Sequence, residues 1–193
     1  VKIDMKKKLF PDDYLYLNDT LCVAKIIEPI GNNDYKPSVA RWNMATGEIN
    51  PMPYEYPDLK KVRFIYTASA EHQLYVQCYT QYDLMTICDF NGNLKCNIYG
   101  PKWVNEKTQT QHYSLGVEFC GDKILALYSG GDHRTDAYYP TKFLVFDLNG
   151  NYLKTLETGY MITDFCYDKE NNRLIINLND EIQFAYLDLE GII

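Results

Sequence analysis

The sequence repeats one short phrase at nearly constant spacing, and this repetition constrains the fold more than any other feature. Four times an apolar run is followed by a polar turn that carries a glycine, in Asn43–Ile49, Asp89–Leu94, Asp147–Leu153 and Asp188–Ile193. Glycine readily adopts the positive φ that a tight hairpin turn requires. Each copy therefore predicts a hairpin turn between two strands.

A second phrase precedes each of these turns and consists of an apolar run, a short polar turn and another apolar run. Its copies are Tyr14–Ile26, Phe64–Cys78, Leu115–Tyr128 and Asp164–Leu178. The equivalent positions, 53, 50 and 50 residues apart, are Leu21, Leu74, Ile124 and Leu174. We therefore predict units of four strands, a to d, joined up and down.

Four-stranded units that repeat every 40 to 50 residues or so (about 50 here) are typical of β-propeller blades. No long segment has helical periodicity, and the 18 tyrosines favour strands. We predict an all-β fold, a β-propeller of four-stranded antiparallel blades in a single domain, 1–193. The expected parts are a leading strand in 1–10 and blades at roughly 11–52, 62–100, 112–158 and 160–193. A β-sandwich is the structural alternative, because it also alternates short strands with turns.

Composition and charge exclude several classes of protein. The net charge of −7 argues against nucleic acid as a partner, because phosphate binding needs a basic stripe. None of the six cysteines forms a C-x-x-C pair, so neither a zinc ribbon nor a thioredoxin-type site is expected, and buried free thiols are favoured over a disulfide. No apolar segment is long enough to span a membrane. No cofactor is predicted.

The phrases "FDLNGNYLKTL" (146–156) and "DFCYDKENNRLIINL" (164–178) together resemble the TolB-like six-bladed propellers of Bacteroidetes, predicted lipoproteins and secreted proteins of unknown function. Asp89, Asp147 and Asp188 match the aspartate that follows strand c in that family, whereas Asn43 departs from it. The resemblance implies six blades, so we expect this chain to be a C-terminal portion. It also implies a periplasmic or cell-surface location, with a lipid anchor on the missing N-terminus as one option. It supplies no catalytic residues.

The long connections are all predicted at one end of the propeller. In an up-and-down blade the a–b and c–d turns lie at one end, and the b–c and d–a connections lie at the other. The second group contains every long loop: Glu28–Pro37, Asn50–Lys61, Gly100–Tyr113 and Ser129–Lys142. Long loops on a rigid scaffold are often functional, so this end is the predicted binding surface. The alternatives are packing against missing blades and tolerated insertions.

The third unit has the densest set of candidate ligand-binding residues. They are Trp103, His112, Asp132, His133, Arg134, Asp136, Tyr138 and Tyr139. Aromatic rings beside hydrogen-bonding groups suit recognition of sugars or proteins. Acidic and imidazole groups this close could also bind a metal, but their spacing matches no EF-hand, and we predict no metal site. Trp42 is expected in the core, and His72 in an exposed turn.

The sequence favours a non-enzymatic binding or scaffold module that presents its loops to a glycan, a peptide or a protein partner. The alternative is a metal-dependent propeller hydrolase or lyase acting on a small molecule. That alternative needs ligands on the innermost strands, where the sequence offers Glu118 and Asp164, with His112 just before one strand. No nucleophile elbow, zinc-protease motif, P-loop or dinucleotide fingerprint is present.

Overall fold

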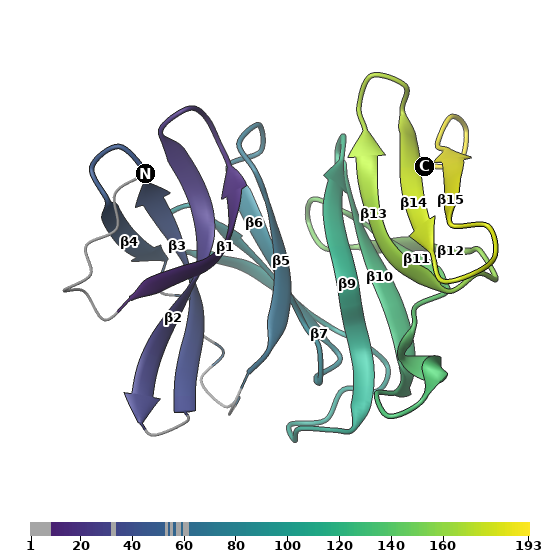
Figure 1. Cartoon of the computed structure of the whole chain (residues 1–193), viewed down its shortest axis with the longest axis horizontal. Coiled ribbons are helices and arrows are strands. Elements are labelled where there is room, and N and C mark those ends of the chain that lie inside the picture. Colours follow the sequence, from purple (N-terminus) through teal and green to yellow (C-terminus); the bar gives the residue numbers. More distant parts are fainter. Residues whose placement is uncertain (1–8, 32–33, 53, 55, 57–58, 60–61) are drawn as a thin grey trace.

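The computed structural model describes residues 9–31, 34–52, 54, 56, 59 and 62–193. Within these residues the regular structure is β-strand apart from one turn of 3₁₀ helix, η1 (Asp136–Tyr138). The strands form four separate antiparallel sheets (Figure 1). The predicted all-β class is therefore confirmed.

Each sheet is built from strands that follow one another in the sequence. The first contains β1 (Phe10–Tyr16), β2 (Leu21–Gly31), β3 (Asp34–Asn43) and β4 (Glu48–Met52). The second contains β5 (Phe64–Ser69), β6 (Leu74–Tyr79), β7 (Leu84–Asp89) and β8 (Leu94–Tyr99). The third contains β9 (Thr110–Cys120), β10 (Lys123–Asp132), β11 (Lys142–Asp147) and β12 (Tyr152–Glu157). The fourth contains β13 (Ile162–Asp168), β14 (Arg173–Leu178) and β15 (Phe184–Asp188).

The four sheets are blades of a β-propeller. Within each sheet, consecutive strands are antiparallel neighbours. The first strands of adjacent sheets lie next to one another, so that β9 contacts both β5 and β13. Figure 1 shows the four sheets standing side by side in sequence order, from purple to yellow. We call them blades 1 to 4.

Several predicted boundaries are wrong. The predicted loops Gly100–Tyr113 and Ser129–Lys142 are shorter than expected, because β9 begins at Thr110 and β10 continues to Asp132. The segment Glu28–Pro37 is not a long loop, because β2 continues to Gly31 and β3 begins at Asp34, so that the two strands form an extended hairpin. The fourth blade has three strands in the described part of the chain, and Leu189 to Ile193 form a turn where a d strand was expected to begin. The predicted leading strand lies mostly in residues 1–8, outside the described residues.

In the second strand of an inner blade, neighbouring residues pack into the cores on opposite sides of that blade. This packing holds the blades together. Tyr75 packs with Val23 of blade 1, whereas the next residue, Val76, packs with Ile124 of blade 3. Leu125 then packs with core residues of blade 4. Successive side chains of a strand point to opposite faces of its sheet, so a strand between two other blades must be apolar on both faces. This explains why β6 and β7 are almost completely buried.

The repeated turn phrase has a specific hydrogen-bonding role. The Asp89 carboxylate accepts from the backbone N–H groups of Asn91 (2.8 Å) and Asn93 (2.9 Å) and from the Asn93 side chain (2.8 Å). Asp147 accepts the equivalent three bonds in blade 3 at the same distances, 2.8, 2.9 and 2.8 Å. The asparagine side chains are the main reason why the pKa of each of these carboxyls is lowered. The phrase recurs because it closes the c–d hairpin of a blade.

The glycines of these turns have the predicted conformation. Gly47, Gly92, Gly150 and Gly191 all have positive φ, between 69° and 84°. Trp42 is 3% exposed and lies on β3, as expected for a core residue. All six cysteines are free; Cys22, Cys78, Cys88 and Cys120 are buried, and Cys166 is exposed.

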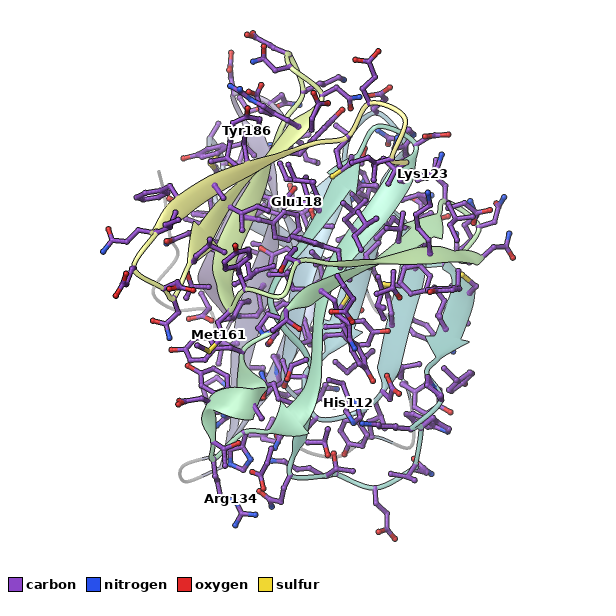
Figure 2. The ribbon with its side chains drawn as sticks, turned by 90° about the vertical axis from the view of Figure 1, so that its right-hand side faces the viewer. His112, Glu118, Lys123, Arg134, Met161 and Tyr186 are labelled. Carbon is purple, nitrogen blue, oxygen red and sulfur yellow. The ribbon has the colours of Figure 1, made fainter. Side chains whose placement is uncertain are left out.

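The alternating strands give the propeller two different ends. The short a–b turns, such as Gly121–Asp122 between β9 and β10, lie at the upper end in Figure 1. The end of β2, the start of β3 and η1 lie at the lower end. Figure 2 shows the same polarity at the residue scale, with Lys123 near the upper end, Arg134 near the lower end and Glu118 between them. We call the lower end the loop-bearing end.

Candidate functional site

The loop from Asp132 to Tyr139 projects at the loop-bearing end and is held in place by its own hydrogen bonds. The Asp132 carboxylate accepts from the Arg134 backbone N–H (2.9 Å) and from its guanidinium (3.3 Å). The backbone bond is the main reason why the pKa of Asp132 is lowered. Thr135 caps η1 by accepting from the Ala137 N–H. Arg134 and Asp132 therefore bind each other, which leaves fewer of their bonds free for a ligand.

The base of this loop is fixed to β10. The Ser129 hydroxyl donates to the Ala137 carbonyl (2.7 Å) and accepts from the Gly131 N–H (3.0 Å). A β-carbon on Gly131 would meet the Ala137 carbonyl oxygen at 1.8 Å, so the loop crosses the strand in van der Waals contact. Only glycine permits so close a backbone approach.

Tyr138 and Tyr139 form the aromatic part of the loop. Their ring centroids are 4.2 Å apart and the planes are tilted by 32°. The side-chain hydrogen bond with Tyr139 is the main reason why the pKa of Tyr138 is raised. On the other side of the loop the His133 ring nitrogen Nδ1 lies 2.9 Å from the Gln109 carbonyl oxygen. Two half-buried tyrosine rings held close together on a fixed loop can contact a partner with little loss of conformational freedom.

His112 does not lie in a loop, contrary to the sequence-based expectation. It is part of β9, is 1% exposed, and its Nδ1 atom lies 3.3 Å from the Tyr128 hydroxyl and 3.7 Å from Asp83 Oδ1. Burial is the main reason why its pKa is lowered, against the opposing effect of Asp83. The Tyr128 hydroxyl and the Lys102 N–H both donate to Asp83 Oδ2. His112 thus belongs to a buried polar cluster between blades 2 and 3.

Trp103 is also less available than the sequence suggested. Its ring lies 5.0 Å from that of Tyr99, 5.8 Å from that of Tyr56 and 6.3 Å from that of Tyr82. The indole is half-buried and packs against the core between blades 1 and 2. This aromatic cluster anchors the connection between β8 and β9. Of the eight predicted site residues, the structure brings together Asp132, His133, Arg134, Asp136, Tyr138 and Tyr139, and it separates Trp103 and His112 from them.

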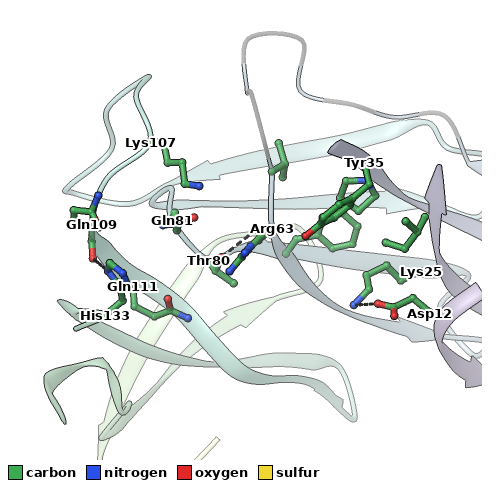
Figure 3. Close-up of a pocket in the computed structure, with 14 residues that line it drawn as sticks. Asp12, Lys25, Tyr35, Arg63, Thr80, Gln81, Lys107, Gln109, Gln111 and His133 are labelled. Carbon is green, nitrogen blue, oxygen red and sulfur yellow. Dashed lines mark hydrogen bonds and ion pairs between the residues drawn. The ribbon is translucent and has the colours of Figure 1, made fainter. Parts of the chain in front are cut away.

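Beside the Asp132–Tyr139 loop, the structure has an open hollow of about 810 Å³ that extends from blade 1 to blade 3. Its polar lining comes from Asp12, Lys25, Tyr35, Arg63, Thr80, Gln81, Lys107, Gln109, Gln111 and His133. Figure 3 shows Lys107 and Gln109 on one side, Asp12 and Lys25 on the other, and Arg63 between them. Ile27, Pro37, Val62 and Phe64 supply apolar surface. We call this cavity the basic hollow.

The net charge of the residues that line the basic hollow is opposite in sign to the net charge of the whole chain. Lys25, Arg63 and Lys107 are the lysine and arginine side chains of the lining, and Asp12 is the one carboxylate among the described lining residues. Asp12 pairs with Lys25 at 2.9 Å. No ion pair or side-chain hydrogen bond of Arg63 or Lys107 is found within the described part of the chain. The hollow therefore has unpaired positive charge in a protein whose net charge is −7.

A smaller hollow of about 190 Å³ adjoins the first and is lined by acidic groups. Lys25 and Phe64 line both, and Asp13, Glu118 and Asp164 face only the smaller one. Burial, reinforced by the nearby Asp164, raises the pKa of Glu118 to about 7. His112 does not line this hollow. The three candidate ligands of the enzyme alternative, Glu118, Asp164 and His112, are therefore not brought together here. The described residues contain no cluster of three or more His, Cys, Asp or Glu placed to hold a metal.

The residues of the basic hollow could not be selected from the sequence. Lys25 lies in the middle of a strand, Arg63 just before one, and Lys107 in a loop, and they are separated by some 40 positions each. None of these three residues belongs to a sequence motif. The repeat of the four-strand unit was the sequence feature that could have helped to locate the hollow. It implies that equivalent positions of successive blades lie around the same axis.

Comparisons with known proteins support the fold and no finer class. No family model matches the sequence, and no similar sequence was found among the curated proteins. A chain of a nidogen/laminin complex superposes with a TM-score of 0.57 at 12% identity, covering 88% of this chain and 57% of that one.

Two bacterial structures are also similar. BamB from Moraxella catarrhalis has a TM-score of 0.51 at 12% identity and covers 90% of this chain and 56% of its own. A protein of unknown function from Bacteroides caccae has a TM-score of 0.50 at 15% identity, covering 78% and 50%. The chain thus spans between 50% and 57% of the length of these structures. At such low identity the similarity establishes a shared propeller fold, and that is the class to which this protein belongs.

Among the described residues, none forms a helix with the length and apolar character needed to cross a membrane.

Proposed function

We propose that this propeller is a non-enzymatic module that binds a protein partner through its loop-bearing end. The observation that carries the proposal is the fixed Asp132–Tyr139 loop, which holds two tyrosine rings 4.2 Å apart and places His133 in the lining of the open basic hollow. Aromatic anchors beside a cavity are typical of the centre of protein interfaces. One of the solved structures with this fold is a complex of nidogen with laminin, which gives a precedent for a propeller in a protein complex.

Two features favour a binding module over the alternative of a metal-dependent hydrolase or lyase. The imidazole of His112 is directed into the interior cluster with Asp83 and Tyr128, away from the acidic hollow. The loop-bearing end, in contrast, offers an open cavity of a size that suits a side chain or a short segment of another molecule. A glycan remains the second ligand class, because tyrosine rings also stack on sugars.

We also propose that the chain is part of a TolB-like six-bladed propeller of the bacterial envelope, located in the periplasm or on the cell surface. The turn phrases of blades 2 to 4 support this assignment, and Asn43 in blade 1 departs from it. Fractionation of the native cells and the intact mass of the native protein test the proposal. Recovery in the cytosol, or a mass equal to that of these 193 residues, would overturn it.

The double substitution Tyr138→Ala with Tyr139→Ala tests the binding function. We expect the partner captured by the wild-type protein from an extract of its own organism to be lost, or weakened at least tenfold, because central aromatic residues supply about 2 kcal/mol or more of binding energy each. Tyr16→Ala is the matched control, since Tyr16 is 67% exposed at the opposite end. Equal capture by the wild type and the double variant, both of them folded by circular dichroism, would contradict the proposal.

A further inference from the structure

The basic hollow contains unpaired cations in a chain that has a surplus of acidic groups. The sequence has 26 Asp and Glu against 19 Lys and Arg. Elsewhere in the described part, five basic side chains form ion pairs with carboxylates: Lys123, Arg134, Lys142, Lys169 and Arg173. Arg63 and Lys107 have no such pair among the described residues, and neither do Arg41, Lys95, Lys102 and Lys154. Arg63 and Lys107 differ from these four because they line one cavity together with Lys25. Unpaired like charges that face one cavity repel each other and raise the energy of the empty site.

The lining also offers neutral hydrogen-bonding groups next to the cations. Gln111 and Gln109 lie on the side of Lys107, and no side-chain hydrogen bond of either amide is found in the described residues (Figure 3). An amide group can both donate and accept, so it can pair with the backbone of an extended peptide. Figure 3 shows the Lys107 ammonium directed toward the same space as the Arg63 side chain. Cationic and amide groups thus share one face of the cavity.

We propose that the basic hollow binds an acidic, extended segment of the protein partner. This inference rests on the proposed protein-binding function and names the chemistry of its ligand. The cations are spread along the hollow, with Lys107 and Lys25 on opposite sides and Arg63 between them, so one small carboxylate could not reach all three (Figure 3). A segment with acidic side chains at successive positions would contact them in turn. Arg63 would form the strongest of these bonds, because a guanidinium can bind a carboxylate through two parallel hydrogen bonds.

Asp12 weakens the binding of an acidic ligand at the end of the hollow opposite Lys107. Its carboxylate is 2.9 Å from the Lys25 ammonium and is half-exposed, so it competes with an incoming acidic group for the same cation. Removing this charge frees Lys25 and lowers the repulsion on the ligand. Asp12→Asn should therefore bind the acidic segment more tightly, which loss of folding could not produce.

The experiment measures binding of a fluorescent peptide, Gly-Glu-Asp-Glu-Asp-Gly, by anisotropy, together with its amide counterpart, Gly-Gln-Asn-Gln-Asn-Gly. We expect the acidic peptide to bind and the amide peptide to bind at least tenfold more weakly. Arg63→Gln and Lys107→Gln should each weaken the acidic peptide by about fivefold, and Asp12→Asn should strengthen it by about two- to fivefold. Lys95→Gln on β8 is the matched control and should leave binding unchanged.

Three outcomes would overturn the proposal. They are equal binding of the two peptides, no effect of Arg63→Gln, and competition by free glutarate or inorganic phosphate as strong as by unlabelled acidic peptide. The last would assign the hollow to a small anion. If the acidic peptide fails but partner capture still depends on Tyr138 and Tyr139, only this inference fails. If capture does not depend on those tyrosines, the proposed function fails.

Discussion

At the scale of single residues, the turn glycines show how local conformation and packing between blades combine. Gly150 has φ +84°, and a β-carbon there would meet Cys96 Sγ at 2.6 Å and Ile98 Cδ1 at 3.0 Å, both on the neighbouring blade. Gly159 has a similar φ, +74°, with open space around it. The repeated turn of blade 3 thus also packs against β8.

We expect Gly150→Ala to be more destabilising than Gly159→Ala. The second change introduces strain at positive φ alone and should lower the free energy of unfolding by about 1 kcal/mol. The first adds a steric conflict with blade 2 and should cost about 2–4 kcal/mol in total. Urea unfolding of the two variants measures the difference, and equal losses would show that the contact with Cys96 is unimportant.

Glu118 is the residue for which we expect the clearest pH dependence. Its folded pKa of about 7 lies above the ordinary value of 4.5. Between these values the folded state therefore binds more protons than the unfolded state, so this group makes the protein less stable as pH rises through that window. Glu118→Gln removes the buried charge and should raise the free energy of unfolding at pH 8 by about 1–3 kcal/mol.

The test of Glu118 compares unfolding at pH 5 and pH 8. The wild type should lose stability over this range relative to Glu118→Gln. Asp164→Asn should reduce that difference, because Asp164 is the second cause of the raised pKa. If the free energies of unfolding of the wild type and Glu118→Gln change in parallel with pH, the pKa of Glu118 is not raised in the folded protein, and the prediction is wrong.

Sequence reasoning identified the turn residues but not the residues whose role depends on distant partners. The positive φ of Gly92 and Gly150 could be predicted, because the hairpin turn alone dictates it. The burial of His112 could not, since it depends on Asp83, which precedes β7, and on Tyr128 of β10. For the same reason Arg63 and Lys107 were missed as site residues.

At the scale of structural elements, the cluster around Asp83 joins blades 2 and 3. Asp83 precedes β7, its carboxylate is buried, and its Oδ2 atom accepts from both the Lys102 N–H and the Tyr128 hydroxyl. A β-carbon on Gly100 would overlap the carboxylate, at 2.1 Å from Oδ1, so the chain after β8 also packs directly on it. The cluster therefore fixes the start of the β8–β9 connection, which lines the loop-bearing end.

We expect Asp83→Ala to destabilise the protein by about 3–5 kcal/mol, because it leaves buried donors without an acceptor. Tyr128→Phe removes only one hydroxyl of the cluster and should cost about 1–2 kcal/mol. Thermal unfolding and hydrogen exchange of the β8–β9 connection measure both effects. A loss for Asp83→Ala no larger than for Tyr128→Phe would mean that the carboxylate does not organise this junction.

The β2–β3 hairpin shows why some element boundaries could not be predicted. Pro29, Gly31 and Pro37 suggested a loop, since they weaken strands. In the structure the register with β1 ends at Ile27, and beyond it β2 and β3 pair only with each other within the described residues. A two-stranded hairpin has a free edge on each side, where a missing proline N–H is tolerated.

At the scale of the whole molecule, the unit repeat was enough to predict the propeller but not its surface. The period of about 50 residues fixed the number and order of the blades. In the structure the apolar second strands of the inner blades lie between two cores, and both of their faces are covered. The distribution of charge along the axis, with a basic hollow at the loop-bearing end and an acidic one beside it, arises from residues of several blades. This charge distribution could not be predicted without the arrangement of the blades.

The most direct test of the account is hydrogen–deuterium exchange of the propeller with and without its captured partner. The account predicts that protection on binding falls on the Asp132–Tyr139 loop, the β8–β9 connection and the start of β5, all at the loop-bearing end. The short turns at the opposite end, such as that around Gly121, should be unchanged. Protection confined to those turns, or to the edge strand β15, would contradict the claim that the loop-bearing end is the binding surface.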